Sequence, residues 1–555
     1  MEIRFLAGSS GSGKSKRLYD TLLDISEREP DRRLFLVVPE QFTMQAQRNI
    51  VENSAGHGTF SIDIVSFNRL AYRVFEELGI EIPTPIDDTG KNLILRKIID
   101  ENKKKLTIIR PKDSQGFVSE IKSVISELLQ YSVTPEMLGD ACTRLDEGGI
   151  NNHERLRRKL NDISLIYSEF REYISDKYIT TEEITGILCG YADKSKLLEN
   201  AVIAFDGFTG FTPVQYRLIE LLFDKAESMY FTVTLPVDGD RWLFNMSYDM
   251  MRRIGECADK NHVKVIRENI GQDVPYRFIN SPELAHLEAN IYRKLERYDG
   301  HTEKIRVYSA LGKKAEVKYV AANIKRLAQS GVRYKQIGVI ASSMEDYREI
   351  IANVFAENDI PAFMDNKRAI LANPAVEYIR AALAVIEKDF SYEAVFRLLK
   401  GYMCSINRDE VDIFENYVLA LGIRGYKRYN EPFRRRFPSK REMDMDMVNA
   451  VRTKLCELME PLYKVFHDEN SNVADYIDAL NTFLDENGVY EKLLDLKEQM
   501  ETEHQAAAAK EYGQCYGDII ELFEQTRKLL GDEKMSIRGF SDVLDAGFNE
   551  IKIGI

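Results

Sequence analysis

Cysteine and histidine are scarce in this sequence, and long apolar runs are missing. Its 555 residues include six cysteines and seven histidines, and neither type falls at metal-ligand spacing such as C-x-x-C. That scarcity argues against a zinc site and favours a reducing, cytoplasmic setting. No run of about 18 apolar residues is present, which excludes a transmembrane helix and a membrane role. The N-terminus also lacks the layout of a signal peptide.

Positive charge is in deficit as well. The formal net charge is −13, and the composition of 44% apolar and 30% charged residues is typical of a globular protein. The length suggests about three or four domains of ~150 residues each. Any contact with nucleic acid must therefore come from a local basic surface rather than from the overall charge.

The most informative segment that is present is a phosphate-binding loop near the N-terminus. The pattern G-x-x-x-x-G-K-[ST] is formed by Gly8, Ser9, Ser10, Gly11, Ser12, Gly13, Lys14 and Ser15. An apolar stretch at 3–7 predicts a strand before it, and the periodicity at 14–25 predicts a helix after it, which is the context that such a loop needs. We expect the loop to bind ATP, with Lys14 on the phosphates and Ser15 on Mg²⁺. The alternative is a flexible Gly/Ser turn with an unrelated lysine.

Strand-like and helix-like segments alternate around this loop. Short apolar runs at 33–39, 61–67, 201–206 and 229–235 predict strands of a parallel sheet, and 86–194 between them is helical in pattern. A second alternation begins near 304, with strands expected at 305–310 and 336–341 and helices at 315–328 and 346–357. Helices dominate beyond about 385, and the strand-like end at 551–555 suggests a truncated piece of a longer chain.

The predicted fold class is therefore α/β, with two RecA-like P-loop domains that carry large helical insertions. The first RecA-like domain is expected to consist of 1–85, which holds the phosphate loop, and 195–300, with 86–194 inserted between them as helices. The second RecA-like domain is expected to begin with 301–385, followed by a helical insertion at 386–555.

A P-loop site needs a carboxylate at the end of a neighbouring strand to hold Mg²⁺, commonly followed by a Glu that polarises water. Asp206 ends an apolar strand and is the best candidate, but its neighbour is Gly207, which has no side chain to activate water. This pair predicts ATP binding without efficient hydrolysis. An ordinary turn or N-cap aspartate is the alternative for Asp206.

Several motifs in order resemble one known family. Residues 206–216 (DGFTGFTPVQY) are similar to the superfamily 1 helicase pattern D-E-x-Q-(D/N)-x-x-x-x-Q-Y, and 66–71 (SFNRLA) to its S/T-F-x-x-L-A motif. Residues 38–46 (VPEQFTMQA) and 548–554 (FNEIKIG) resemble AddB, the B subunit of the bacterial AddAB helicase–nuclease, along the whole chain. The resemblance implies a DNA-binding subunit that acts in double-strand break repair by homologous recombination, with an AddA-like partner subunit as the motor.

The sequence departs from the pattern of active motors. The Glu is missing at Gly207, and 235–240 (LPVDGD) lacks the coupling Gln of the G-D-x-x-Q motif. The resemblance also implies a nuclease domain and an iron–sulfur cluster, both expected only beyond Ile555. An active superfamily 1 helicase stays open as an alternative, as does a P-loop small-molecule kinase, although a kinase needs neither the second alternation nor the long helical insertion.

The resemblance implies that single-stranded DNA crosses the carboxyl ends of the strands, where the family recognises the recombination hotspot Chi. The candidate DNA-contact residues there are Gln41, Thr43, Phe67, Arg69, Tyr72 and Phe208. Gln and Arg can pair with base edges, and aromatic rings can stack on bases. Backbone capping is the alternative for Gln41 and Thr43, and core packing is the alternative for Phe67.

A second candidate DNA surface is the segment 424–441, whose basic residues alternate with aromatic ones. Its candidate phosphate contacts are Arg424, Lys427, Arg428, Arg434, Arg435 and Arg436. Phosphate neutralisation together with aromatic stacking is the functional interpretation. A solvated loop, or a face that meets an acidic partner, explains the same pattern equally well.

Overall fold

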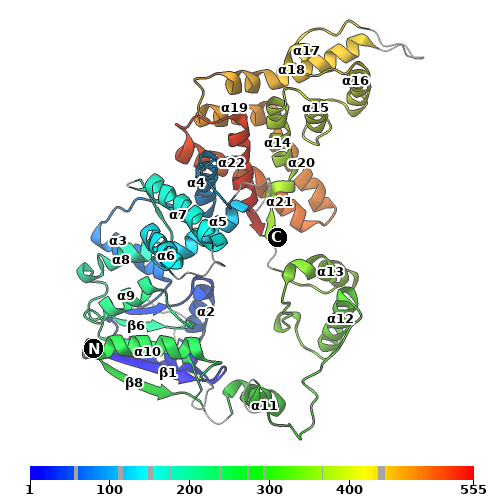
Figure 1. Cartoon of the computed structure of the whole chain (residues 1–555). Helices are drawn as coiled ribbons and strands as arrows, with labels where there is room; N and C mark the ends of the chain where they lie inside the picture. Colours follow the sequence, from blue (N-terminus) through cyan, green and yellow to red (C-terminus); the bar gives the residue numbers. More distant parts are fainter. Residues whose placement is uncertain are drawn as a thin grey trace. The chain divides into compact units, whose positions relative to one another are not determined.

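The computed structural model describes residues 1–54, 61–109, 117–147, 154–175, 177–236, 241–271, 274–291, 295–364, 367–435 and 444–554. The chain divides into two compact units, each built from three segments (Figure 1). The first unit contains Met1–Ile64, Asn200–Gly210 and Ala226–Asn366. The second contains Val65–Glu199, Phe211–Lys225 and Lys367–Ile555.

A six-stranded sheet is the centre of the first unit, within the described residues. Its order is β3 (Ile62–Val65), β2 (Leu34–Val37), β6 (Val202–Phe205), β7 (Ser228–Thr234), β1 (Glu2–Gly8) and β8 (Lys264–Asn269). The pairs β1·β7, β1·β8, β2·β6 and β6·β7 are parallel. The strands that follow the helical segment in the sequence thus lie beside those that precede it.

The inner strands β2, β6 and β7 are buried at almost every position, which explains why they are apolar runs rather than alternating patterns. Helices α1 (Lys14–Arg28) and α2 (Thr43–Asn53) contribute Leu18, Leu22 and Ile50 to a core with the strand residues. Elsewhere in the sheet, the rings of Phe205 and Phe231 stack with centroids 4.7 Å apart. The carboxyl ends of the strands stay available for loops.

Of the second alternation of strands and helices predicted from residue 304 onward, the helices are present and the strands are not. Its helices are α12 (Lys313–Gln329) and α13 (Met344–Glu357), which pack on each other through residues such as Ile324 and Phe355. The strands predicted at 305–310 and 336–341 are wrong: both stretches are described, and neither forms one. Apolar runs become strands only where neighbours take up their backbone hydrogen bonds. Here Val307 is 97% and Ile340 99% exposed.

The described part of the first unit also contains helices α10 (Asn245–Lys260) and α11 (Pro282–Asn290).

Helices make up most of the second unit. The first group is α3 (Phe67–Leu78), α4 (Asp88–Glu101), α5 (Phe117–Gln130), α6 (Pro135–Glu147), α7 (Glu154–Ile174), α8 (Ile184–Cys189) and α9 (Pro213–Leu222), with the small parallel pair β4 (Thr84–Ile86) and β5 (Tyr178–Thr180). The helical pattern expected at 86–194 is confirmed, and the buried residues of α5 and α7 share one core with those of α4.

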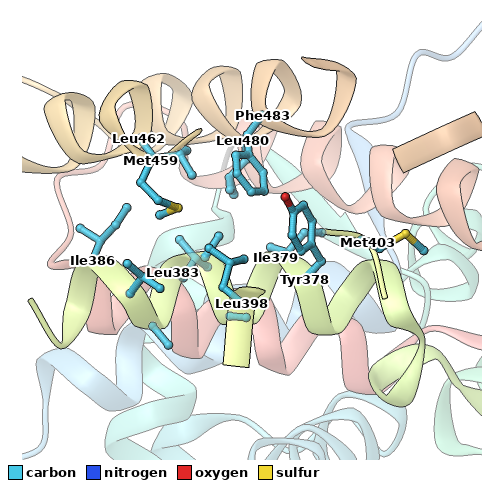
Figure 2. Close-up of a cluster of buried hydrophobic side chains, with 14 of the residues drawn as sticks. Tyr378, Ile379, Leu383, Ile386, Leu398, Met403, Met459, Leu462, Leu480 and Phe483 are labelled. Atoms are coloured by element: carbon cyan, nitrogen blue, oxygen red, sulfur yellow. The ribbon is translucent and has the colours of Figure 1, made fainter. Parts of the chain in front are cut away.

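The second group of helices follows residue 370. It comprises α14 (Pro374–Glu387), α15 (Tyr392–Leu399), α16 (Arg408–Leu421), α17 (Tyr426–Asn430), α18 (Met445–His467), α19 (Val473–Glu486), α20 (Val489–Thr502), α21 (Ala506–Leu530) and α22 (Ile537–Glu550). Figure 2 shows Tyr378 and Leu383 of α14 facing Met459 of α18 and Phe483 of α19. Helix α14 is buried on nearly all sides, as its almost uninterrupted apolar sequence requires.

A short antiparallel ribbon closes this group at its two ends. Strand β9 (Lys367–Ala369) precedes the helices and pairs with β10 (Lys552–Gly554), which follows them. Helix α22 packs against α4, and charged groups link the two helical groups: Lys122 of α5 binds Glu550 at 2.9 Å, and Arg96 of α4 binds Asp542 at 2.5 Å. The two helical groups therefore form one body.

Candidate nucleotide site and DNA-contact residues

The phosphate-loop pattern occupies the predicted context, between the end of β1 and the start of α1. Two of its glycines have left-handed backbones, with φ of 78° at Gly11 and 97° at Gly13, which other residues adopt only with strain. A Cβ at Gly8 would lie 2.3 Å from the carbonyl oxygen of Ile270. The path of the loop thus requires these glycines, which argues against the alternative of a flexible turn.

Helix α1 begins without a side-chain cap, because Gly13 stands at its N-cap. The N–H groups of its first turn are therefore left for an anion, which the helix dipole also favours. Lys14 is partly buried, and its ammonium donates to the carbonyl oxygen of Ser9 at 2.8 Å. The pKa of Lys14 is lowered to about 8, chiefly by burial and to a smaller extent by the charge of Arg277, against the opposite effects of Asp206 and Glu288. A bound phosphate would supply the negative charge that this lysine lacks.

Three hydroxyl groups hold the carboxylate of Asp206. Oδ1 accepts from Ser15 Oγ at 2.9 Å and from Thr232 Oγ1 at 2.6 Å, and Oδ2 accepts from the Tyr19 hydroxyl at 2.8 Å. Burial, and then the charge of Asp206, raise the pKa of Tyr19, so this hydroxyl stays protonated and can donate. The structure thus brings Ser15 and Asp206 together across 191 positions of sequence.

The donors at this point fit a magnesium ion. No group of three or more His, Cys, Asp or Glu side chains gathers as a metal site in the described part of the chain. Magnesium bound with a nucleotide needs only one or two protein oxygens, because phosphates and waters complete its shell. Ser15 Oγ and Asp206 Oδ1 are such oxygens, and they are already within 2.9 Å of each other.

The position after Asp206 is shaped for glycine. Gly207 has a φ of 81°, and a Cβ there would contact Pro39 and Phe42 at 3.6–3.7 Å. The turn that follows β2 therefore packs against the turn that follows β6. Besides lacking a side chain to polarise water, this position has a backbone on which a Glu would be strained.

Sequence reasoning missed Arg277, which lies at the edge of the phosphate loop. The backbone N–H of Arg277 donates to the Gly11 carbonyl at 3.2 Å, and a Cβ added to Gly11 would lie 2.6 Å from the Cβ of Arg277. It belongs to a short 3₁₀ helix (Tyr276–Phe278) that follows β8, a strand that the sequence analysis did not predict. The exposed guanidinium lies close enough to influence the Lys14 pKa.

Of the candidate DNA-contact residues in the first unit, Gln41 is exposed and Phe208 is half-buried, with its ring edge-on to Phe205. Thr43 is buried, and its hydroxyl donates to the Glu40 carbonyl at 2.8 Å. The hydroxyl of Thr43 thus satisfies a backbone group, which is the alternative to DNA contact given for this residue in the sequence analysis. The neighbouring Phe42, which the sequence analysis did not single out, is 42% exposed, more than either Thr43 or Phe208.

In the second unit, Phe67 is only 6% exposed, and its ring lies edge-on to Phe211. It begins α3, for which Ser66 is the N-cap that accepts from the Arg69 N–H. Phe67 is thus placed as a packing residue. Arg69 and Tyr72 are both exposed on the same helix, so their side chains can reach a ligand.

The basic segment divides into exposed charges and inward rings. The side chains of Arg424, Lys427, Arg428, Arg434 and Arg435 are exposed, whereas Arg436 lies outside the described residues. The expected stacking role of the rings is wrong for Tyr429, which is fully buried in the helical core. Tyr426 stacks on Tyr463, with centroids 3.7 Å apart, and Phe433 on Tyr417. Among the described residues of this segment, the exposed charges remain the candidates for a nucleic-acid surface.

The helices found in the described residues include none with the length and apolar character to cross a bilayer.

Comparison with known proteins gives two consecutive family matches. Residues 5–288 match the family described as ADDB, N-terminal, and residues 273–545 match the UvrD-like helicase C-terminal domain. The first covers the phosphate loop and Asp206, and the second begins just before Arg277 and covers the helices up to α22. The chain as a whole is thus similar to helicase-like proteins.

Curated relatives match along the entire chain. Proteins named as the B subunit of an ATP-dependent helicase/deoxyribonuclease are 36% identical in Lachnoclostridium phytofermentans, 33% in Clostridium novyi and 32% in Clostridium kluyveri. Each match covers 100% of this chain and 49% of the relative. The chain therefore spans about half the length of the curated relatives it matches.

Proposed function

The chain belongs to the AddB N-terminal family and has a helicase-like fold, and from that premise we propose that it is the nucleotide-binding, DNA-reading portion of the B subunit of a helicase–nuclease. It binds Mg²⁺-ATP at the phosphate loop but is not itself the motor. The observation that carries the proposal is the contact of Ser15 with Asp206, because it joins the two halves of a P-loop site while Gly207 leaves out the group that would activate water.

The roles of the residues follow from their positions. Lys14 and the N-terminal N–H groups of α1 bind the phosphates, and Ser15 and Asp206 hold the magnesium ion, which neutralises phosphate charge when bound. Arg277 is placed to add a second cation at the phosphates from the other side of Gly11. With no carboxylate at 207 to position water, turnover by this chain alone is slow.

The DNA-reading element of the proposal rests on the exposed candidates. Gln41, Arg69 and Tyr72 offer amide, guanidinium and ring groups to single-stranded bases, consistent with recognition of a hotspot such as Chi. The exposed charges between Arg424 and Arg435 serve as a sequence-independent phosphate surface. An AddA-like helicase–nuclease subunit is the proposed partner and motor, and the cytoplasm, where ATP and chromosomal DNA meet, is the proposed compartment.

The first experiment measures ATP binding and ATP turnover on one sample, with and without single-stranded DNA. Binding without turnover supports the proposal, whereas DNA-stimulated turnover would replace it with the active-helicase alternative. Phosphoryl transfer to a small acceptor would instead support a kinase.

Substitution of the loop lysine tests the site itself. Lys14→Ala removes a charge-assisted contact with phosphate and should weaken ATP binding by at least about tenfold. Lys16→Ala is the matched control, because Lys16 is exposed on the same helix and binds only Asp20, at 3.3 Å, among its described contacts. Equal affinity of Lys14→Ala and the unaltered protein would refute the phosphate-loop assignment.

Two variants separate DNA reading from DNA binding. Arg69→Ala should reduce discrimination between sequences more than overall affinity. Arg434→Ala should weaken all sequences alike and lower the slope of log affinity against log salt by about one. The reverse pattern would exchange the roles of the two surfaces.

A further inference from the structure

Tyr19 stands one helical turn after Ser15 on α1, so both side chains lie on the same face of the helix. That face meets the end of β6, where the Tyr19 hydroxyl donates to Asp206 Oδ2 at 2.8 Å. Thr232 reaches the same carboxylate from β7 and donates to Oδ1 at 2.6 Å. The phosphate-loop pattern includes neither residue.

The two hydroxyls fix different degrees of freedom of the carboxylate. With Oδ2 bound to Tyr19, the group cannot rotate about its Cβ–Cγ bond without losing a buried hydrogen bond. Thr232 approaches Oδ1, the oxygen that Ser15 also contacts, and leaves that oxygen on the side of the phosphate loop. A carboxylate oxygen can accept more than one such bond and still bind a cation.

We propose that Tyr19 and Thr232 are positioning residues that hold the Asp206 carboxylate with Oδ1 directed at the nucleotide-bound magnesium ion. This inference rests on the proposed nucleotide function and deepens it. Neither hydroxyl touches nucleotide or reacting atoms, so each acts on the cation through Asp206. Groups that orient a metal ligand in this way typically change metal affinity about 10- to 100-fold when they are removed.

The readout is the magnesium dependence of ATP binding rather than ATP turnover. In the full 555-residue chain, ATP binding is measured by calorimetry over a titration of MgCl₂ and again in EDTA. Tyr19→Phe keeps the ring in its packing site and removes only the hydroxyl. It should raise the half-saturating Mg²⁺ concentration by about tenfold or more and leave the affinity in EDTA unchanged.

Thr232→Val makes the same test from a different strand and should shift the Mg²⁺ dependence in the same direction. Tyr230→Phe is the matched control, because Tyr230 is a buried tyrosine of β7 with no described contact to Asp206. Circular dichroism verifies that each variant is folded. If one variant fails to fold, the other still decides the question.

The outcomes are distinguishable. A shifted Mg²⁺ dependence in Tyr19→Phe or Thr232→Val, absent from Tyr230→Phe, supports the inference. Unchanged Mg²⁺ dependence in both folded variants overturns it while leaving ATP binding by the unaltered protein intact. Equal losses of affinity with and without Mg²⁺ also overturn it, since they indicate a damaged loop rather than a misdirected carboxylate. If the unaltered protein binds no ATP at all, the proposed function itself fails.

Discussion

Buried and partly buried carboxylates of the two units have different kinds of partners. In the second unit, Glu182 binds Lys91 at 2.7 Å and Glu550 binds Lys122 at 2.9 Å. Asp162 in the same unit accepts backbone N–H groups of Thr107 and the two residues that follow it. Asp206 in the first unit has only neutral hydroxyl partners among its described hydrogen bonds.

The difference separates a structural carboxylate from one that can take a ligand. An ammonium or amide group can only donate, so the carboxylates of the second unit are already satisfied and their geometry is set by the fold. A serine or threonine hydroxyl also carries lone pairs and can rotate. It can donate to the carboxylate when no cation is bound and direct a lone pair at the cation when one is. The negative charge of Asp206 is therefore held in place but not neutralised by an ion pair among the described contacts.

The largest effect on stability should come from breaking a pair in the second unit. Lys91 is 1% exposed and binds Glu182, Asp88 and Ser126. Lys91→Ala leaves the partly buried Glu182 carboxylate without its cation and should lower the free energy of unfolding by about 3–5 kcal/mol. Denaturant unfolding followed by circular dichroism measures the loss, because the second unit contains most of the helices.

An exposed pair of the same length is the control for that variant. Arg252 and Glu256 lie 2.7 Å apart on the surface of α10, and Arg252→Ala should leave stability almost unchanged because water screens the pair. A Lys91→Ala loss as small as this control would mean that the second unit does not depend on its buried charges.

The next largest effect on the stability of the second unit should come from lowering the pH. Burial alone would raise the pKa values of Glu182 and Glu550, but it is outweighed by Lys91 at Glu182 and by the hydrogen bonds from Ser119 and Lys122 at Glu550, so both pKa values are lowered. A carboxyl whose pKa is lower in the folded state stabilises that state above its unfolded pKa, and this contribution is lost as the pH falls through the folded pKa. The melting temperature of the second unit should therefore hold steady near pH 7 and fall below about pH 4.5.

Hydrogen exchange on peptides from α4 and α22 at several pH values tests this dependence in the region concerned. Earlier loss of protection in peptides from β1 and β6 than in these helices would contradict it.

Introducing the Glu that is missing after Asp206 should lower stability by less than Lys91→Ala and should not raise ATP turnover. Gly207→Glu places a side chain on a left-handed backbone beside Pro39 and Phe42 and should lower stability by about 1–2 kcal/mol. Gly207→Ala has the same backbone strain and is the matched control. ATP turnover should not rise in either variant, because the turn does not direct a side chain at position 207 without strain. A turnover gain specific to Gly207→Glu would show that the acid alone was lacking.

The smallest effect on stability should follow from neutralising Asp206. Asp206→Asn keeps the size of the side chain and can still bond to rotatable hydroxyls, so stability should change by about 1 kcal/mol or less. ATP affinity in Mg²⁺ should fall to the value found in EDTA, as titration calorimetry can measure. A loss of stability comparable to that of Lys91→Ala would place Asp206 with the structural carboxylates.

Sequence reasoning located what is local and missed what depends on the fold. The phosphate loop and the pairing of Ser15 with Asp206 follow from a continuous motif and a strand end, and the structure brings both together. Thr232 and Arg277 are ordinary residues in sequence, and only the fold brings them to the site. Tyr19 lies one helical turn after Ser15, but nothing in the sequence marks it as a partner of Asp206.

The errors have a common physical origin. An apolar run at 305–310 has the composition of a buried strand, but composition does not supply the neighbouring strand that it needs. Tyr429 alternates with basic residues like a stacking ring, yet the same spacing directs it into the core between α17 and α18. In both cases the sequence shows the pattern but does not show which residues lie next to it in the fold.

The ribbon of β9 and β10 brings the two ends of the second group of helices together. Because Lys552–Gly554 pairs with Lys367–Ala369, a stretch of about 180 residues begins and ends at the same place in the fold. Lengthening or shortening the stretch between, one helix at a time, leaves the distance between the two ends unchanged. Recombination between genes could thus exchange this stretch as a block, restricted chiefly by the face of α22 that must still match α4.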